Sequence, residues 1–250
     1  LRLALTSFQQ AYTWVGGAPL DDELMFRAAQ NITAGEWLGA YDYLTLSKAM
    51  FFPVWLALLH ALHLPYLVAS AALWCGAALL AAFAFSPLWR KKQPEQGRVL
   101  TLALFAALAF LPSSWAAYTL RVYRDNIFPA LCLYFFAGMA GMALRAVFEK
   151  DKPLWPWLAA AGAGLACGYL DREDAGLFLL PFAAAATVIV ALVLVGKRRW
   201  KALAAQVIPY AMLGVGVLTF CTLNYTHYGV FALSDFSEGS FAAAMGAMMR

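Results

Sequence analysis

The chain has 250 residues, of which 63% are hydrophobic and 13% are charged, and its formal net charge is +4. Soluble domains are about 45–50% apolar and about 25% charged, so this composition excludes an ordinary soluble fold. The basic residues gather in short loops between apolar runs, which indicates membrane topology and not nucleic-acid binding.

The N-terminal part of the chain is the least apolar. Residues 1–48 are mixed polar and aromatic and include the acidic run Asp21, Asp22 and Glu23. Residues 49–64 are apolar but short, because a helix needs about 20 residues to cross a hydrocarbon core of about 30 Å. We therefore expect residues 49–64 to be interfacial or re-entrant.

Six uncharged apolar runs follow, at 65–89, 99–120, 127–144, 153–170, 175–196 and 202–223. Lipid admits only helices and closed barrels, and these runs lack the alternation of barrel strands. The sequence therefore predicts an all-α, polytopic membrane protein with three parts. They are a first extracytoplasmic loop with juxtamembrane helices (1–64), a bundle of about six transmembrane helices (65–223) and an extracytoplasmic segment (224–250).

The loops between these runs divide by charge. The loops 90–98, 145–152 and 197–201 hold eleven of the eighteen Lys and Arg residues, and the opposite loops and the two ends hold eleven of the fourteen acidic residues. The positive-inside rule predicts that the basic loops face the cytoplasm. An N-terminal region on the outer side then implies a further helix upstream, and we expect this chain, which begins with Leu1, to be part of a longer protein.

Three charged motifs are predicted on the outer face: Asp21-Asp22-Glu23, Arg121 with Arg124-Asp125, and Asp171-Arg172-Glu173-Asp174. Carboxylates at a membrane surface can act as a general base or hold a divalent cation. Arginines beside them can neutralise a phosphate group. Charged loop tips are also common in membrane proteins of every kind, so the motifs alone do not name a reaction.

Small residues and cysteines have a simpler interpretation. Gly138, Gly141, Gly162 and Gly164 suit close packing of helices. The four cysteines lie inside apolar runs without CxxC spacing, so the sequence predicts neither a disulfide framework nor a zinc site.

The order of several motifs carries a resemblance. The acidic pair precedes Ala29, then comes the run GEWLGAY at 35–41, and then TLSK at 45–48 followed by Pro53. This order resembles the first extracytoplasmic loop of bacterial GT-C membrane glycosyltransferases, the superfamily of protein mannosyltransferases and aminoarabinose transferases. The segments 121–126, 170–174 and 224–231 resemble later parts of the same family, so the resemblance covers about residues 19–245. The residues after Lys48 depart from the lysine–proline–glycine usual in the family.

The resemblance implies an enzyme that moves a hexose or pentose, with inversion, from a polyprenyl-phosphate donor to a glycan, lipid or protein acceptor. It places this enzyme in the bacterial inner membrane with its active site facing outward, among membrane lipids. It implies that Asp22 is the base, or Asp21 if the register differs by one, and that Asp125 is a second acidic position. The implied substrate-binding residues are Arg124, Arg172, Glu173, Lys48 and Tyr41. Some members of the family need a divalent metal and others do not, so a metal stays open, with Asp22 and Asp125 as candidate ligands.

Two other classes of protein compete with the enzyme. A transporter or flippase of a lipid-linked substrate normally has ionisable residues within its spans, whereas the six runs contain no Asp, Glu, Lys or Arg. A non-catalytic scaffold subunit needs no acid–base motifs clustered on one face. Motifs gathered at one outer cavity would favour the enzyme, and motifs that point apart would favour the scaffold.

Overall fold

The computed structural model describes residues 1–13, 20–42, 44–90, 94–149, 152–235, 244 and 246–248. In these residues the regular structure is helical, apart from an isolated bridge between Tyr12 and Arg121. The predicted basic residues Lys91, Lys92 and Lys150, and most of the predicted tail beyond Asp235, lie outside the described residues. The α-helices are α1 (Arg2–Thr6), α2 (Leu20–Ala34), α3 (Phe51–Ala61), α4 (Tyr66–Phe85), α5 (Pro87–Arg90), α6 (Pro94–Ala109), α7 (Phe128–Phe148), α8 (Trp155–Asp171), α9 (Gly176–Gly196), α10 (Trp200–Ala205) and α11 (Ile208–Tyr228). Three short 3-10 helices lie between α6 and α7: η1 (Pro112–Trp115), η2 (Ala117–Leu120) and η3 (Arg124–Asn126).

The described residues contain four helical segments long and apolar enough to cross a membrane, so the chain is an all-α membrane protein. These segments are Tyr66–Trp89, Arg124–Phe148, Gly176–Gly196 and Trp200–Tyr228. The prediction of about six spans is only partly confirmed, because α6 has 16 residues and α8 has 17. At 1.5 Å per residue these two helices are about 25 Å long, which is less than a hydrocarbon core of about 30 Å.

The predicted span 99–120 was wrong in its second half. Helix α6 ends at Ala109, and residues 112–126 contain the three short 3-10 helices instead of a continuous helix. The physical reason is Pro112, which lacks a backbone N–H and disfavours the helical conformation of the residue before it. Leu111 is accordingly extended, with φ −57° and ψ 126°. This break creates a folded segment at the end of the bundle.

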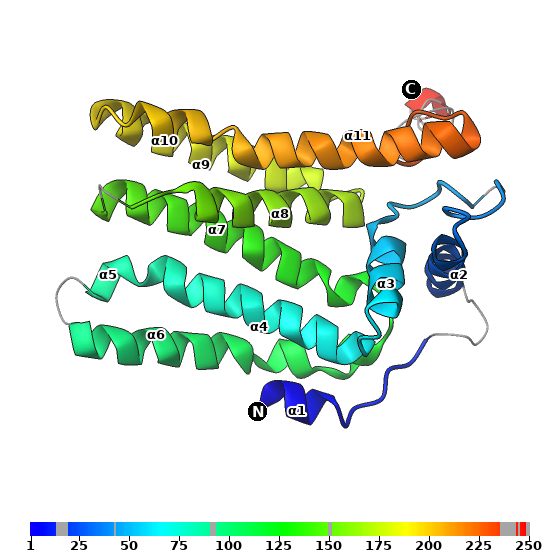
Figure 1. Ribbon diagram of the computed structural model, residues 1–250, viewed down its shortest axis with the longest axis horizontal. Helices are drawn as coiled ribbons and strands as arrows, with labels where there is room; N and C mark the ends of the chain where they lie inside the picture. The colour runs from blue at the N-terminus through cyan, green and yellow to red at the C-terminus, as the bar shows by residue number, and fades with distance from the viewer. Residues whose placement is uncertain are drawn as a thin grey trace.

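The long helices lie side by side, and α3 crosses the ends of α4, α7 and α8 (Figure 1). Helix α7 packs against α4 and α8, and α8 also packs against α11. The closest approach is between α7 and α8, where a Cβ at Gly164 would lie 2.4 Å from the backbone nitrogen of Phe135. A Cβ at Gly138 would lie 2.5 Å from the backbone nitrogen of Ala161. The expected role of glycines in helix packing is therefore confirmed for this pair.

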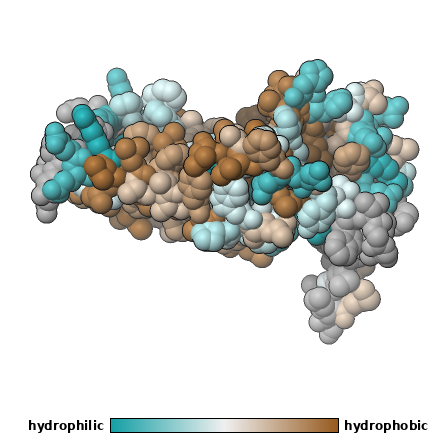
Figure 2. All heavy atoms as spheres, turned by 90° about the horizontal axis from the view of Figure 1, so that it is seen from below, coloured by the Kyte–Doolittle hydropathy of each residue, from teal (hydrophilic) through white to brown (hydrophobic). Residues whose placement is uncertain are grey.

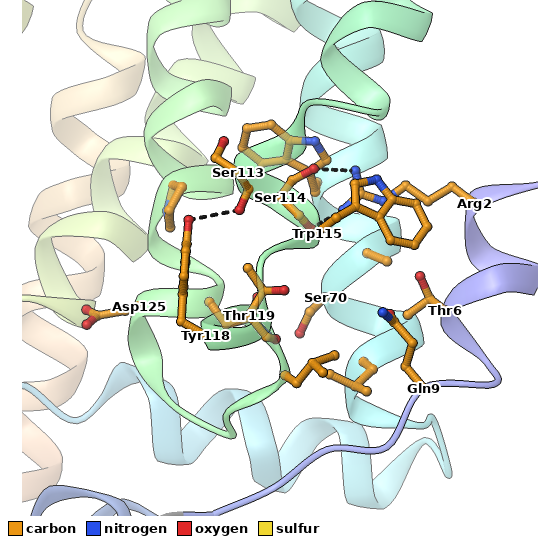
Figure 3. Close-up of a pocket in the computed structure, with 16 residues that line it drawn as sticks. Arg2, Thr6, Gln9, Ser70, Ser113, Ser114, Trp115, Tyr118, Thr119 and Asp125 are labelled. Carbon is orange, nitrogen blue, oxygen red and sulfur yellow. Dashed lines mark hydrogen bonds between the residues drawn. The ribbon is translucent and has the colours of Figure 1, made fainter.

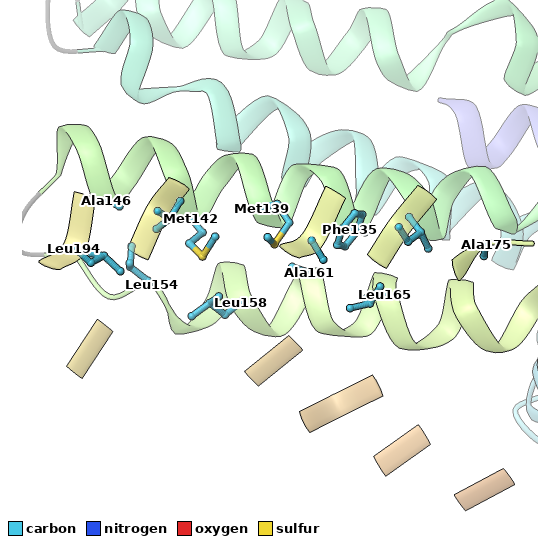
Figure 4. Close-up of a cluster of buried hydrophobic side chains, with 13 residues drawn as sticks. Phe135, Met139, Met142, Ala146, Leu154, Leu158, Ala161, Leu165, Ala175 and Leu194 are labelled. Carbon is cyan, nitrogen blue, oxygen red and sulfur yellow. The ribbon is translucent and has the colours of Figure 1, made fainter. Parts of the chain in front are cut away.

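Large apolar side chains fill the space beside this glycine contact (Figure 4). Phe135, Met139 and Met142 on α7 form a buried cluster with Leu158 and Leu165 on α8. Residues of α9 complete the cluster. The cluster fixes the positions of the helix ends at which the charged motifs lie.

Apolar atoms dominate the middle of the face drawn in Figure 2, and hydrophilic side chains gather towards its ends. The end at which α7 and α9 terminate is basic. There Arg145 donates a hydrogen bond to the carbonyl of Phe83 at 2.9 Å, and Lys197 donates to the carbonyls of Ala146 and Val147 at 2.7 Å. Cations at the carboxyl ends of helices also complement the helix dipole. The three charged motifs lie at the opposite end, which is the end that α3 crosses (Figure 1).

Candidate functional site

The first pair in the candidate site joins the first turn of α2 to the segment before α7. Asp22 is buried, with 4% of its surface exposed. The Nε of Arg121 donates to Oδ2 of Asp22 at 2.9 Å, and its Nη2 donates to Oδ1. This two-point contact raises the pKa of Arg121, chiefly through the hydrogen bond to the carboxylate. Bidentate arginine–carboxylate pairs are directional, so the pair fixes the orientation of the predicted base.

Asp21 lies beside this pair and contacts a tyrosine of the same segment. The hydroxyl of Tyr123 donates to Oδ2 of Asp21 at 2.9 Å, and Nζ of Lys48 lies 3.6 Å from the same oxygen. The guanidinium of Arg121 stacks over the Tyr123 ring at 4.4 Å. Burial, together with the hydrogen bond to Asp21, raises the pKa of Tyr123 to about 12, although the nearby Arg124 acts in the opposite direction. The tyrosine therefore stays a hydrogen-bond donor at neutral pH and links Asp21 to the loop that also contains Arg121, the partner of Asp22.

Arg124 connects the same segment to the end of α8. Its Nη1 donates to both carboxylate oxygens of Glu173, at 3.1 and 3.0 Å, and to the carbonyl of Asp171 at 3.3 Å. Glu173 also accepts the backbone N–H of Ala49 at 2.6 Å, just before α3. Three separate parts of the chain therefore meet at Glu173. Arg124 is buried in this arrangement, so its guanidinium is engaged by the protein and not exposed for a ligand.

Arg172 is the more accessible of the two arginines predicted to bind phosphate. Its Nη1 donates to Oδ1 of Asp125 at 2.5 Å, and its Nε and Nη2 donate to Asp174 at 2.9 and 3.1 Å. The hydrogen bond to Asp174 is the largest cause of the raised pKa of Arg172. The same contact lowers the pKa of Asp174. The pairing Arg172–Asp125 therefore joins the second and third charged motifs.

Asp171 differs from the other acidic residues of the site. It is the last residue of α8 and is fully buried, and within the described part of the chain neither carboxylate oxygen has a hydrogen-bond partner. Burial raises its pKa well above the usual value, and the nearby Arg124 only partly offsets this effect. A carboxyl group in this environment favours its neutral form.

One predicted binding residue, Tyr41, belongs to a different structural unit. Its ring lies 5.4 Å from that of Tyr228 at the end of α11. The run GEWLGAY folds onto that helix, because Nε1 of Trp37 donates to Asn224 at 2.9 Å and the Tyr228 hydroxyl donates to the carbonyl of Gly39 at 2.8 Å. Gly39 has φ +94°, a conformation that side chains disfavour. This motif thus docks the first loop onto α11, and no contact given by the structure links Tyr41 to the charged network.

The sequence left a divalent metal open, with Asp22 and Asp125 as candidate ligands. The described residues contain no group of three His, Cys, Asp or Glu side chains placed to hold an ion. The two candidate ligands are engaged separately, Asp22 by Arg121 and Asp125 by Arg172. Their arrangement thus fits ion pairing with arginine.

Arg121, Tyr123 and Asp171 were not among the predicted site residues, although Arg121 and Asp171 belong to the charged motifs and Tyr123 lies between Arg121 and Arg124. The pairing of Arg121 with Asp22 joins residues 99 positions apart, so spacing could not reveal it. The signal for Asp171 is its place directly after an apolar run, where a carboxyl group can remain inside the bundle.

Seven of the eight predicted site residues thus take part in ion pairs at one end of the bundle, and these pairs connect the three charged motifs: Asp21, Asp22, Lys48, Arg124, Asp125, Arg172 and Glu173. Comparison of the chain with family models, curated proteins and solved structures finds no match.

Proposed function

We propose that the chain forms the catalytic part of a membrane glycosyltransferase of the GT-C type. The enzyme would move a sugar from a polyprenyl-phosphate donor to an acceptor on the outer face of the membrane. The observation that carries this proposal is the convergence of the three charged motifs, which lie about 50 to 150 residues apart in the sequence. An ordinary set of loop charges has no reason to converge, because exposed ion pairs contribute only about 0–1 kcal/mol.

In the proposed reaction Asp22 accepts the proton of an acceptor hydroxyl, and the acceptor oxygen forms a bond to the anomeric carbon of the donor. The bond from that carbon to the phosphate oxygen breaks, and polyprenyl phosphate leaves with the electron pair. Arg121 holds the carboxylate of Asp22 in position, and one of its two hydrogen bonds opens when the acceptor hydroxyl takes its place. Arg172, which is partly exposed, offsets the charge that develops on the leaving phosphate.

The test is a transfer assay on the full-length protein in liposomes, with radiolabelled polyprenyl-phosphate sugars. We expect Asp22→Asn to reduce transfer at least about 100-fold, because general bases typically contribute 10²–10⁴-fold. The matched control is Asp42→Asn, since Asp42 lies in the same loop and pairs with the exposed Arg27. We expect this control to stay within about twofold of wild type, as surface pairs contribute little.

Equal melting temperatures of wild type and Asp22→Asn would show that the loss is not caused by misfolding. Full transfer by both Asp22→Asn and Asp21→Asn would exclude Asp22 and Asp21 as the base. If no donor in a broad panel supports transfer while labelled lipid crosses the bilayer, the protein is a transporter and not an enzyme.

A further inference from the structure

A cavity of about 140 Å³ lies between α1, α4 and the 3-10 turns that follow α6 (Figure 3). One water molecule takes up about 30 Å³ in the liquid, so the cavity is several water molecules in size. This size suits one small ring compound. The cavity exists because Pro112 ends α6 early and the chain folds back as short turns.

The lining combines aromatic rings with hydroxyl and amide groups. Trp115 and Tyr118 point towards the cavity, and the Tyr118 hydroxyl donates to the carbonyl of Ser113 at 2.8 Å (Figure 3). The neutral polar side chains that line it are those of Thr6, Gln9, Ser70, Ser113, Ser114, Thr119 and Asn126. Hydroxyl and amide groups both donate and accept hydrogen bonds, and aromatic faces cover the apolar C–H surface of a ring. This combination matches a hydroxylated ring.

Two of the lining residues are charged, and both are bound by other groups of the protein, Arg2 through hydrogen bonds and Asp125 through an ion pair. Arg2 donates from Nη1 to Ser114 Oγ at 2.8 Å and to the carbonyl of Ala109, and from Nη2 to the carbonyl of Ser114 at 2.9 Å. Its guanidinium also lies 4.8 Å from the centre of the Trp115 ring. Asp125 pairs with Arg172. A phosphate group would need accessible charge-assisted donors, but both terminal nitrogens of Arg2 are engaged by the protein and its Nε is buried, so an uncharged ligand fits better.

The cavity adjoins the charged network. Asp125 and Asn126 line it and belong to η3, and Arg124 of the same turn binds Glu173. A ligand in the cavity therefore lies beside Asp125, the ion-pair partner of Arg172, to which we assign the leaving phosphate. A donor sugar carries its phosphate on the anomeric carbon, whereas an acceptor unit needs only a free hydroxyl group and can be uncharged.

We propose that this cavity binds one uncharged monosaccharide unit of the acceptor, which is therefore a glycan. The identification of this sugar as the acceptor rests on the proposed function. The binding of a neutral sugar can be tested without a transfer assay.

The experiment measures saturation-transfer difference NMR on the full-length protein in nanodiscs. The probes are methyl α-D-mannopyranoside, methyl α-D-glucopyranoside, methyl β-D-galactopyranoside and α-D-glucose 1-phosphate. We expect at least one methyl glycoside to bind and Ala71→Leu to weaken that binding at least tenfold, because Ala71 lines the cavity and the larger side chain fills it. Ala72→Leu is the matched control, since Ala72 is the next residue of α4 and is exposed.

A second pair of variants covers the case in which Ala71→Leu does not fold. Tyr118 is exposed at the cavity, so we expect Tyr118→Ala to lose glycoside binding and Tyr118→Phe, which keeps the ring, to retain most of it. Absence of binding by every glycoside, equal binding in Ala71→Leu that is folded, or binding of glucose 1-phosphate alone would overturn the proposal. Transfer without glycoside binding would overturn the proposed sugar site and leave the proposed enzyme function intact. Glycoside binding without transfer would support a sugar site and overturn the proposed enzyme function.

Discussion

The carboxyl group of Asp171 shows how strongly a residue's role depends on its surroundings. Five other acidic residues of the site face an arginine or lysine at hydrogen-bond or ion-pair distance, namely Asp21, Asp22, Asp125, Glu173 and Asp174. Asp171 is buried, and its two oxygens have no hydrogen-bond partner in the described part of the chain. Its burial therefore opposes ionisation and raises its pKa.

This raised pKa predicts a specific dependence of stability on pH. The folded state holds the proton of Asp171 more tightly than the unfolded state, whose pKa is about 3.9. The contribution of the Asp171 carboxyl group to the free energy of unfolding is therefore fully present below about pH 4, and it is lost as the pH rises through the folded-state pKa. Asp171→Asn removes the ionisation and should raise the melting temperature at pH 7, by about 2–4 °C for each kcal/mol gained. The difference from wild type should shrink as the pH falls towards 4.

The matched control at the same helix end is Asp174→Asn. Asp174 is exposed and pairs with Arg172, which lowers its pKa. Its stabilising effect is therefore present above about pH 4 and lost as the pH falls, although such a surface pair contributes at most about 1 kcal/mol. Thermal unfolding in detergent between pH 4 and 8 measures both effects. A lower melting temperature of Asp171→Asn at pH 7 would mean that the buried carboxylate is ionised and stabilising.

At the scale of elements, the contact between α7 and α8 sets the geometry of the site, because Arg124 precedes α7 and Glu173 follows α8. A Cβ at Gly164 would lie 2.4 Å from the nitrogen of Phe135 and 2.6 Å from the carbonyl oxygen of Leu131, and both are backbone atoms that cannot move aside. We predict that Gly164→Ala destabilises the protein by about 1–3 kcal/mol, the usual cost of overpacking. Thermal unfolding in detergent measures this loss.

Gly214→Ala in α11 is the control for this prediction, because no described atom beyond its chain neighbours and the backbone of its own helix lies within 4 Å of a Cβ placed there. Alanine is favoured over glycine within helices by about 0.5–1 kcal/mol, so the control should be neutral or slightly stabilising. Equal effects of the two substitutions would show that α7 and α8 do not approach as closely as described.

The sequence predicted these elements well where the apolar runs are long and unbroken. The run 175–196 became α9 (Gly176–Gly196), nearly residue for residue. It predicted them poorly where a helix breaker acts within an apolar run, as at Pro112, because hydropathy does not distinguish a helix from apolar turns. It also did not reveal that Trp37 anchors the first loop on α11, since this contact joins residues 187 positions apart.

At the scale of the whole molecule, the acidic and basic loops lie at opposite ends of the bundle. Positive-inside then predicts that the acidic end faces outward. In intact cells a membrane-impermeant maleimide should label Asp174→Cys and leave Lys201→Cys unlabelled until the membrane is opened. Both residues are exposed, and the native cysteines provide the background in the parent protein. Labelling of Lys201→Cys alone would show that the basic end faces outward, which would contradict the predicted topology and an active site on the outer face.

The sequence by itself determined the class of protein, the approximate positions of its helices and the separation of acidic from basic loops. These properties follow from local composition, because each apolar run must avoid water whatever its neighbours are. Only the tertiary structure decided that Asp22 pairs with Arg121, that Arg124 meets Glu173, and that the carboxylate oxygens of Asp171 have no hydrogen-bond partner among the described residues. These outcomes depend on which helix ends lie side by side, and that depends on the close packing of α7 on α8 and on the early end of α6.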